Sequence, residues 1–281
     1  MKRPTGPFLF LIIVTIPVCG SVRQCGAAAP CVTGVAYGGA GWCAEAGPWN
    51  AVLERVRGTS RGGKVRVHCG GTLISHRHVL TAAHCVWSNS HFPGKVCRQD
   101  YVNLPAKECN DRFCEKQGCL RIEAERNQFG IRVILGLTTT GKTNVKKRKI
   151  SKIFIHPGWN KTASVFDTDG NDLAILELAS PVTDWSPSVN KICLPDINRL
   201  ADFEEFIEIG SKVNVFSFGK TGPGVVDVAE RLQNTELDIL PAENCSAEFQ
   251  GGLFGATGDQ LCTIGEKANV CAGDSGSGVV I

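Results

Sequence analysis

The sequence has no long apolar run, no strong excess of either charge and a single methionine among its 281 residues. The apolar stretch at residues 8–18 has 11 residues, a membrane-spanning helix needs about 20, and no later segment approaches that length. The net charge of +3 is too small to indicate nucleic acid as a partner. With 43% hydrophobic and 20% charged residues, the chain is neither collagen-like, nor a coiled coil, nor disordered.

Glycine and proline are plentiful and favour short strands joined by turns. The chain has 32 glycines and 13 prolines, no βαβ spacing and no internal repeat. These features predict an all-β barrel or sandwich. We expect strands within residues 51–57, 65–67, 71–75, 78–81, 131–135, 149–155, 173–178, 212–218 and 236–240.

Fourteen cysteines indicate either an oxidising compartment or metal binding. The N-terminus favours the first, because Lys2 and Arg3 precede the apolar stretch and Gly20 provides a small residue before a cleavage point at Ser21. We therefore predict a signal peptide at residues 1–20 and a secreted, extracellular protein. Residues 21–35 are then a pro-segment, and residues 36–281 the folded domain.

Residues 86–130 are too long and polar for a simple connection inside a compact β domain. Four cysteines in this segment, Cys97, Cys109, Cys114 and Cys119, have the chemistry for either zinc or disulfides. The paired two-residue spacing of common zinc sites is missing and the compartment is oxidising, so we predict disulfides.

Three short segments carry the strongest chemical signal, in the order His, Asp, Ser. Residues 80–85 read LTAAHC, residues 171–176 read NDLAIL and residues 273–278 read GDSGSG. Each segment alone is weak evidence, since a lone histidine is usually structural and Gly-Asp-Ser-Gly is a common turn. The three together, with CGGTLIS at residues 69–75, are specific.

These motifs closely resemble those of the chymotrypsin/trypsin family of serine endopeptidases, and the resemblance extends over residues 36–281. It implies two six-stranded antiparallel Greek-key barrels. The second barrel is expected to be incomplete, a C-terminal truncation, because the chain stops six residues after Ser275 and family members continue for about fifty more.

The resemblance also implies the role of each residue in the predicted site. His84 is the general base, Asp172 holds its imidazole, Ser275 is the nucleophile, and the N–H groups of Gly273 and Ser275 form the oxyanion hole. The implied reaction is hydrolysis of peptide bonds in protein or peptide substrates through an acyl-enzyme. It uses no organic cofactor or metal; protease inhibitors are expected as partners and a monomer as the oligomeric state.

Activation and specificity depart from the family pattern. In the family a freed N-terminal amine pairs with the aspartate that precedes the nucleophile, which is Asp274 here. Residues 36–39 stand where the family's usual Ile-Val-Gly-Gly N-terminus would be. The residue before them is Val35, in place of a Lys or Arg. Ordinary tryptic activation is therefore not expected. Asn269 takes the position of the specificity-pocket floor, which favours uncharged substrate side chains. Gly276-Ser277-Gly278 replaces the family's Gly-Gly-Pro.

The family pattern further implies disulfides. It pairs Cys69 with Cys85 and Cys245 with Cys262, and it joins Cys193 to Cys25 or Cys31 of the pro-segment. With Cys43 joining the other pro-segment cysteine, Cys271 is left over.

Spacing assigns the extra length to residues 86–130. His84 and Asp172 are 88 residues apart and Asp172 and Ser275 are 103 apart, against about 45 and 93 in the chymotrypsin pattern. We interpret residues 86–130 as a cysteine-rich insertion in a surface loop that borders the substrate cleft. Its hypothetical role is to restrict substrate access or dock a partner.

The rival function is a catalytically silent protease homologue that acts as an extracellular binding or cofactor module. Two other features are interpreted without chemistry. The basic run 146–149 has the charge to contact sulfated glycans but is better explained as a solvated strand edge. Five histidines without metal-site spacing are interpreted as surface or loop residues, namely His68, His76, His78, His91 and His156.

Overall fold

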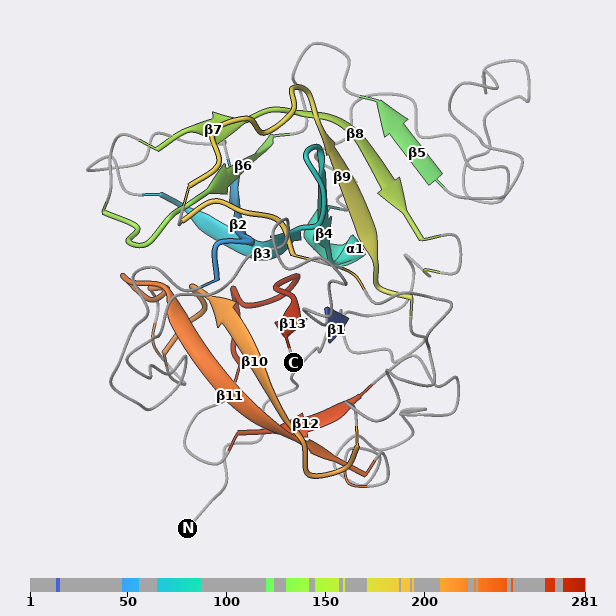
Figure 1. Ribbon diagram of the computed structural model, residues 1–281, viewed down its shortest axis with the longest axis vertical. Helices are drawn as coiled ribbons and strands as arrows, with labels where there is room; N and C mark the ends of the chain where they lie inside the picture. Colours follow the sequence, from blue (N-terminus) through green and yellow to red (C-terminus); the bar gives the residue numbers. More distant parts are fainter. Residues whose placement is uncertain are drawn as a thin grey trace.

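The computed structural model describes residues 14–15, 47–55, 65–86, 120–123, 130–141, 145–156, 171–186, 188–192, 208–221, 227–241, 261–265 and 270–280, with residues 159, 194, 225 and 244. Strands form nearly all regular structure in these ranges, and α1 (Ala83–Val86) is a single helical turn. The predicted all-β class is confirmed. Two sheets lie one above the other in Figure 1. In the described part of the chain, no helix has the length and apolar character to cross a membrane.

The first sheet has eight strands in the order β5-β8-β9-β4-β3-β2-β6-β7, and all neighbours are antiparallel. Leu53, Leu73 and Leu176 are completely buried in its core. The strands are β2 (Asn50–Arg55), β3 (Val67–Leu73), β4 (His78–Thr81), β5 (Leu120–Glu123), β6 (Ile131–Leu135), β7 (Lys147–Arg148), β8 (Ile150–Ile155) and β9 (Ala174–Leu178).

Two strands of this sheet differ from the sequence prediction. β3 is continuous where two separate runs were expected, because its glycines allow close packing and do not make a turn. A Cβ at Gly70 would lie 1.9 Å from Ser277 Oγ, and one at Gly71 would lie 2.9 Å from Val79 Cγ1. β5 comes from the predicted insertion and pairs with β8, so it anchors the carboxyl end of that segment.

The second sheet has five strands in the order β1-β13-β10-β11-β12. The pairing of β1 with β13 is parallel, and the other pairings are antiparallel. The strand counts of eight and five in the described residues replace the predicted six and incomplete six, since β5 and β7 extend the first sheet. β1 lies within the predicted signal peptide. The strands are β1 (Val14–Thr15), β10 (Lys212–Ser217), β11 (Gln233–Leu240), β12 (Cys262–Ile264) and β13 (Val279–Val280).

The two sheets are joined through Phe216 at the end of β10. Its ring packs edge-on against Trp49 with centroids 5.7 Å apart. Its carbonyl accepts a 2.5 Å hydrogen bond from Asn50 Nδ2. One cluster of buried residues contains Trp49 and Ile134 from the first sheet region together with Phe216 and Val280 from the second. This shared core fixes the relative position of the segments that contribute the predicted site.

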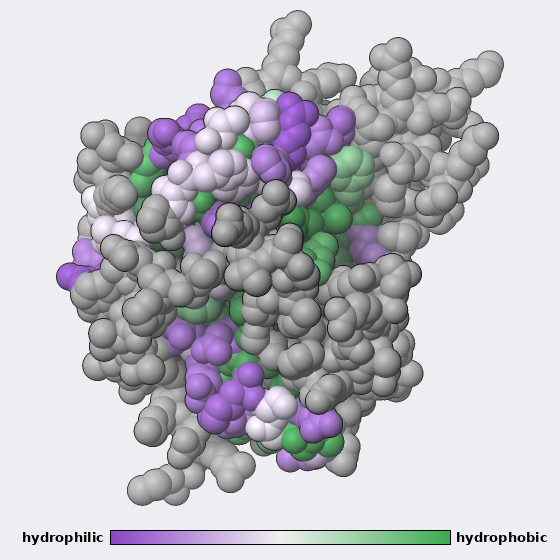
Figure 2. Space-filling model, in the orientation of Figure 1, coloured by the Kyte–Doolittle hydropathy of each residue, from purple (hydrophilic) through white to green (hydrophobic). Residues whose placement is uncertain are grey.

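The basic run 146–149 lies at the free edge of the first sheet, where β7 pairs with β6 alone. Figure 2 shows hydrophilic residues gathered over this edge. Lys147 Nζ is 2.7 Å from Glu54 Oε1, while Lys146 and Arg148 both pair with Asp184. Burial favours a higher pKa for Asp184, but the hydrogen bonds from Lys146 and Arg148 outweigh it and lower the pKa. Three of the four cations are thus paired with two carboxylates of this chain, Glu54 and Asp184.

Candidate active site

His84 lies on α1, directly after β4. A single helical turn has almost no stability of its own, so contacts with other segments must hold it. Asp172 supplies two such contacts at the amino end of α1. The Asp172 carbonyl accepts the N–H of Ala83 at 3.2 Å, and Asp172 Oδ1 accepts the N–H of His84 at 2.8 Å.

The Asp172 carboxylate also binds the imidazole of His84. Oδ2 is 2.6 Å from Nδ1, and the two side chains are 19% and 20% exposed. Since the carboxylate accepts, Nδ1 carries the proton, and the neutral ring has an unprotonated Nε2 that can act as a base. Asn171, with φ of +59°, makes the turn that presents Asp172. Asparagine tolerates this left-handed conformation better than most residues, a signal that the sequence interpretation missed.

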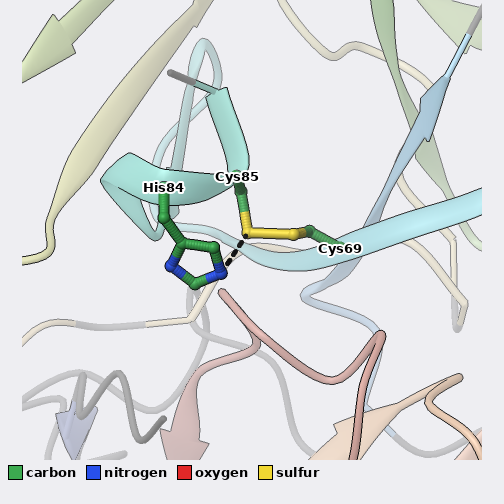
Figure 3. A group of neighbouring side chains, drawn as sticks. All are labelled: Cys69, His84 and Cys85. Atoms are coloured by element: carbon green, nitrogen blue, oxygen red, sulfur yellow. Dashed lines mark hydrogen bonds between the residues drawn. A yellow bond between two sulfur atoms is a disulfide. The ribbon is translucent and has the colours of Figure 1, made fainter. Parts of the chain in front are cut away.

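The disulfide predicted between Cys69 and Cys85 is present and joins β3 to α1. Figure 3 shows that His84 Nε2 points towards Cys85 Sγ, at 3.6 Å. The sulfur and nitrogen atoms of Cys69, His84 and Cys85 lie within 4.8 Å of one another, a grouping also found in metal sites. Metal ligation needs thiolates, and both sulfurs here are covalently bonded to each other, so we assign a disulfide beside an imidazole.

The Ser275 segment is held against β3 and β4. The carbonyl of Ser275 accepts the N–H of Gly70 at 2.8 Å. Gly276 has a φ of +83°, and a Cβ there would lie 2.3 Å from Thr81 Oγ1. Cys85 Sγ is 3.6 Å from the Ser275 carbonyl oxygen, so the segment lies next to α1. Within the described residues, no hydrogen bond joins the Ser275 hydroxyl to His84.

The predicted oxyanion-hole residues lie in the same turn. Gly273 has a φ of +102°, which requires glycine. In the described part of the chain, neither the N–H of Gly273 nor that of Ser275 is used in a hydrogen bond. Both donors are therefore free to bind a substrate oxygen.

Asp274 points away from this turn into the protein and is only 4% exposed. Burial raises its pKa to about 6, although the Ser217 side chain and the N–H groups of Cys271 and Gly219 favour the charged form. The hydrogen bonds that the Asp274 carboxyl accepts from the N–H groups of Cys271 and Gly219 measure 2.7 Å and 2.5 Å. The Ser217 hydroxyl lies nearby without regular hydrogen-bond geometry. No ion pair reaches Asp274 among the described residues.

Two residues that support Asp274 and Ser275 were not found from the sequence. Gly219 leaves room for the Asp274 carboxyl, since a Cβ there would lie 2.1 Å from Asp274 Cγ. Ser277 packs over Gly70 and is 5% exposed, and its hydroxyl has no hydrogen-bond partner among the described residues. Gly219 and Asp274 are 55 residues apart in the sequence, so no local pattern indicates their contact.

Several other residues of the predicted site and disulfides fall outside the described part of the chain. They are Asn269, Cys245 and Cys193, together with most of the insertion. Cys262 is disulfide-bonded, and Cys271 is free and half-buried. His68 and His78 lie on strands β3 and β4 and are half-buried, and His76 lies between these strands and is exposed. His78 Nδ1 is 2.7 Å from Ser75 Oγ, and the His76 ring packs edge-on against Trp185.

Comparisons with known proteins show which sequences this chain is similar to. The family model described as Trypsin matches residues 37–103 and 124–281, and the unmatched residues 104–123 lie inside the predicted insertion. Trypsin-like protease try-5 of Caenorhabditis elegans is 32% identical over 250 residues, covering 83% of this chain and 67% of that protein.

More distant relatives are similar over the same region. CLIP domain-containing serine protease B4 of Anopheles gambiae is 25% identical, over 82% of this chain and 54% of its own length. Melanization protease 1 of Drosophila melanogaster is 26% identical, over 83% and 51%. This chain thus spans about half the length of these two relatives.

A solved structure supports the fold. Neuropsin, a serine protease expressed in the limbic system of mouse brain, has a TM-score of 0.56 at 19% identity, covering 84% of this chain and 78% of that one. The matched family model, with the try-5 relative, establishes the identity: the chain belongs to the trypsin family of serine proteases.

Proposed function

We propose that this protein is a secreted serine endopeptidase that hydrolyses peptide bonds through Ser275, His84 and Asp172. Asp172 keeps the imidazole in the tautomer with the proton on Nδ1. His84 Nε2 takes the proton from Ser275 Oγ as that oxygen attacks the substrate carbonyl. The N–H groups of Gly273 and Ser275 stabilise the oxyanion. Nε2 then protonates the leaving amine, and water hydrolyses the acyl-enzyme by the same steps.

The observation that carries the proposal is the double contact of Asp172 with His84. One carboxylate oxygen fixes the backbone of the histidine and the other fixes its ring, at 2.8 Å and 2.6 Å. A purely structural histidine does not need this combination of features: a carboxylate that orients the ring, an unprotonated Nε2 and the Ser275 segment close by. The Gly70 N–H bond to the Ser275 carbonyl supports the same assignment.

Several finer points belong to the same proposal. The predicted signal peptide delivers the protein outside the cell, and its substrates are proteins or peptides. Asn269 forms the pocket floor and favours uncharged side chains. Cleavage ahead of Ala36 frees an amine that pairs with Asp274 and completes the oxyanion turn.

A fluorophosphonate probe tests the proposal, because it reacts with an activated serine and not with ordinary hydroxyls. The secreted chain is treated before and after proteolytic cleavage ahead of Ala36, and the labelled peptide is identified by mass spectrometry. Labelling of Ser275 that disappears in Ser275→Ala supports the enzyme. Absence of labelling in the cleaved protein rejects it.

A second candidate, the catalytically silent homologue, is favoured by one observation. His84 Nε2 faces the disulfide, and no hydrogen bond among the described residues connects it to the Ser275 hydroxyl. Such a hydrogen bond is often long or absent before substrate binds, so the enzyme remains the better reading. The labelling experiment separates the two candidates.

A further inference from the structure

His68 occupies an irregular position on β3. Between β2 and β3 the register runs Val52 with Gly70 and Leu53 with Cys69, and then shifts so that Glu54 is paired with Val67. His68 is therefore the extra residue of a β-bulge. A bulge breaks the alternation of side chains and re-aims the residue that it contains, and bulges are enriched next to active sites.

The bulge directs His68 to the helix that carries His84. His68 Nε2 is 3.0 Å from the carbonyl oxygen of Cys85. A carbonyl only accepts, so Nε2–H donates, and both the neutral ring with this tautomer and the charged ring can make the bond. The Cys85 carbonyl is one of the last four of α1, which have no partner within the helix.

Three consecutive residues of β3 thus contact both halves of the predicted site. His68 binds the carbonyl of Cys85, Cys69 binds its sulfur, and Gly70 binds the Ser275 carbonyl. The disulfide constrains only the side chain of Cys85, and the contacts from Asp172 constrain only the amino end of α1. The hydrogen bond from His68 adds a constraint on the backbone at the carboxyl end of α1.

We propose that His68 is a positioning residue, whose bond to the Cys85 carbonyl sets the direction of the His84 ring. This inference rests on the proposed function, since it concerns how the general base is aimed at Ser275. Displacement of a catalytic group by about 1 Å lowers rates about 100-fold. His68 therefore influences the rate although it does not touch the reacting atoms.

The experiment measures the second-order rate constant for fluorophosphonate labelling of Ser275, from pH 5 to pH 9, in the full chain cleaved ahead of Ala36. His68→Phe keeps a planar ring and removes the donor, whereas His68→Gln keeps an N–H donor at similar reach. The matched control is His76→Phe, which makes the same change at an exposed residue in the connection between β3 and β4. Mass spectrometry of the Cys69–Cys85 peptide verifies folding.

We expect labelling of His68→Phe to be about 10- to 100-fold slower, with a shifted pH midpoint, and that of His68→Gln and His76→Phe to stay within about threefold of the wild type. Equal rates for the wild type and His68→Phe overturn the inference, as does an equal loss in both His68 variants. His68→Asn, whose side chain is too short to reach Cys85, replaces His68→Phe if that variant is not secreted.

An unlabelled wild type rejects the proposed function and still leaves the positioning measurable. The proton NMR signal of His84 Nδ1–H, strongly deshielded by its bond to Asp172, then reports the ring geometry. It should move or broaden in His68→Phe and persist in His68→Gln. An unchanged signal in His68→Phe counts against the inference.

Discussion

Burial of the Asp274 carboxyl should make the protein less stable as the pH rises from about 4 to about 6. The ordinary pKa is 3.8, and burial raises it to about 6 in the folded protein. Between these values the unfolded chain is ionised while the folded chain keeps its proton, so rising pH favours unfolding. Below both values Asp274 contributes nothing, and above both the full penalty applies. The difference between 3.8 and about 6 corresponds to about 3 kcal/mol.

Urea unfolding of the wild type and Asp274→Asn at pH 4 and pH 7 isolates this contribution. The variant also loses hydrogen bonds to the N–H groups of Cys271 and Gly219. Because most of that loss is the same at both pH values, it cancels when the two differences are subtracted. From pH 4 to pH 7, the wild type should lose about 2 kcal/mol relative to the variant, because at pH 4 the unfolded carboxyl is already more than half ionised and a small part of the penalty is already present.

Asp184→Asn is the matched control with the opposite sign. The pKa of Asp184 is lowered by Lys146 and Arg148, so its contribution is present above its unfolded pKa and is lost as the pH falls through the folded value. Parallel pH dependence of the wild type and Asp274→Asn would refute the reasoning. In the protein cleaved ahead of Ala36, an amine paired with Asp274 would lower the pKa and reverse the slope, which makes the same titration a test of the proposed activation ion pair.

Three further results are expected. Asp172→Asn should slow Ser275 labelling by about 10⁴-fold, since an amide that donates to Nδ1 selects the wrong imidazole tautomer; a loss under tenfold in the cleaved protein contradicts the triad. Ser277→Ala should raise the free energy of unfolding by about 1 kcal/mol in urea titrations, because it deletes a buried hydroxyl without a partner; destabilisation would show that the hydroxyl is satisfied. Heparin should release the protein at or below about 0.15 M salt, since Lys146, Lys147 and Arg148 are already paired with Asp184 or Glu54; elution well above that salt would favour glycan binding over the strand-edge interpretation.

The strands and the candidate catalytic residues could be predicted where a short stretch of sequence carries the pattern. Alternation of buried and partly exposed residues marks β9, which begins and ends within one residue of the predicted run. The segments around His84 and Asp172 were found by motif alone, and the structure brings them within 2.6 Å. Local patterns suffice here because one face of each strand is buried and each motif is continuous in sequence.

The parts that could not be predicted depend on contacts between distant residues. Gly70 lies in the break that was expected between two strands, yet it belongs to the continuous strand β3, where Ser277 leaves no room for a Cβ. The basic run was correctly interpreted as a strand edge, but its pairing with Asp184 could not be predicted, because Asp184 lies 36 residues from Arg148. Register shifts have no sequence signature, so the bulge at His68 was also invisible.

Contacts of this kind determine what the predicted catalytic residues can do. A motif specifies that a histidine, an aspartate and a serine are present, but a one-turn helix cannot aim the histidine by itself. Contacts at both ends of α1 set the orientation of His84. Asp172, which follows the left-handed residue Asn171, holds the amino end, and His68 and Cys69 of β3 hold the carboxyl end. Because Gly70 of the same strand also holds Ser275, a shift of β3 would move base and nucleophile together, whereas a change at His68, Cys69 or Asp172 would move the base against the nucleophile.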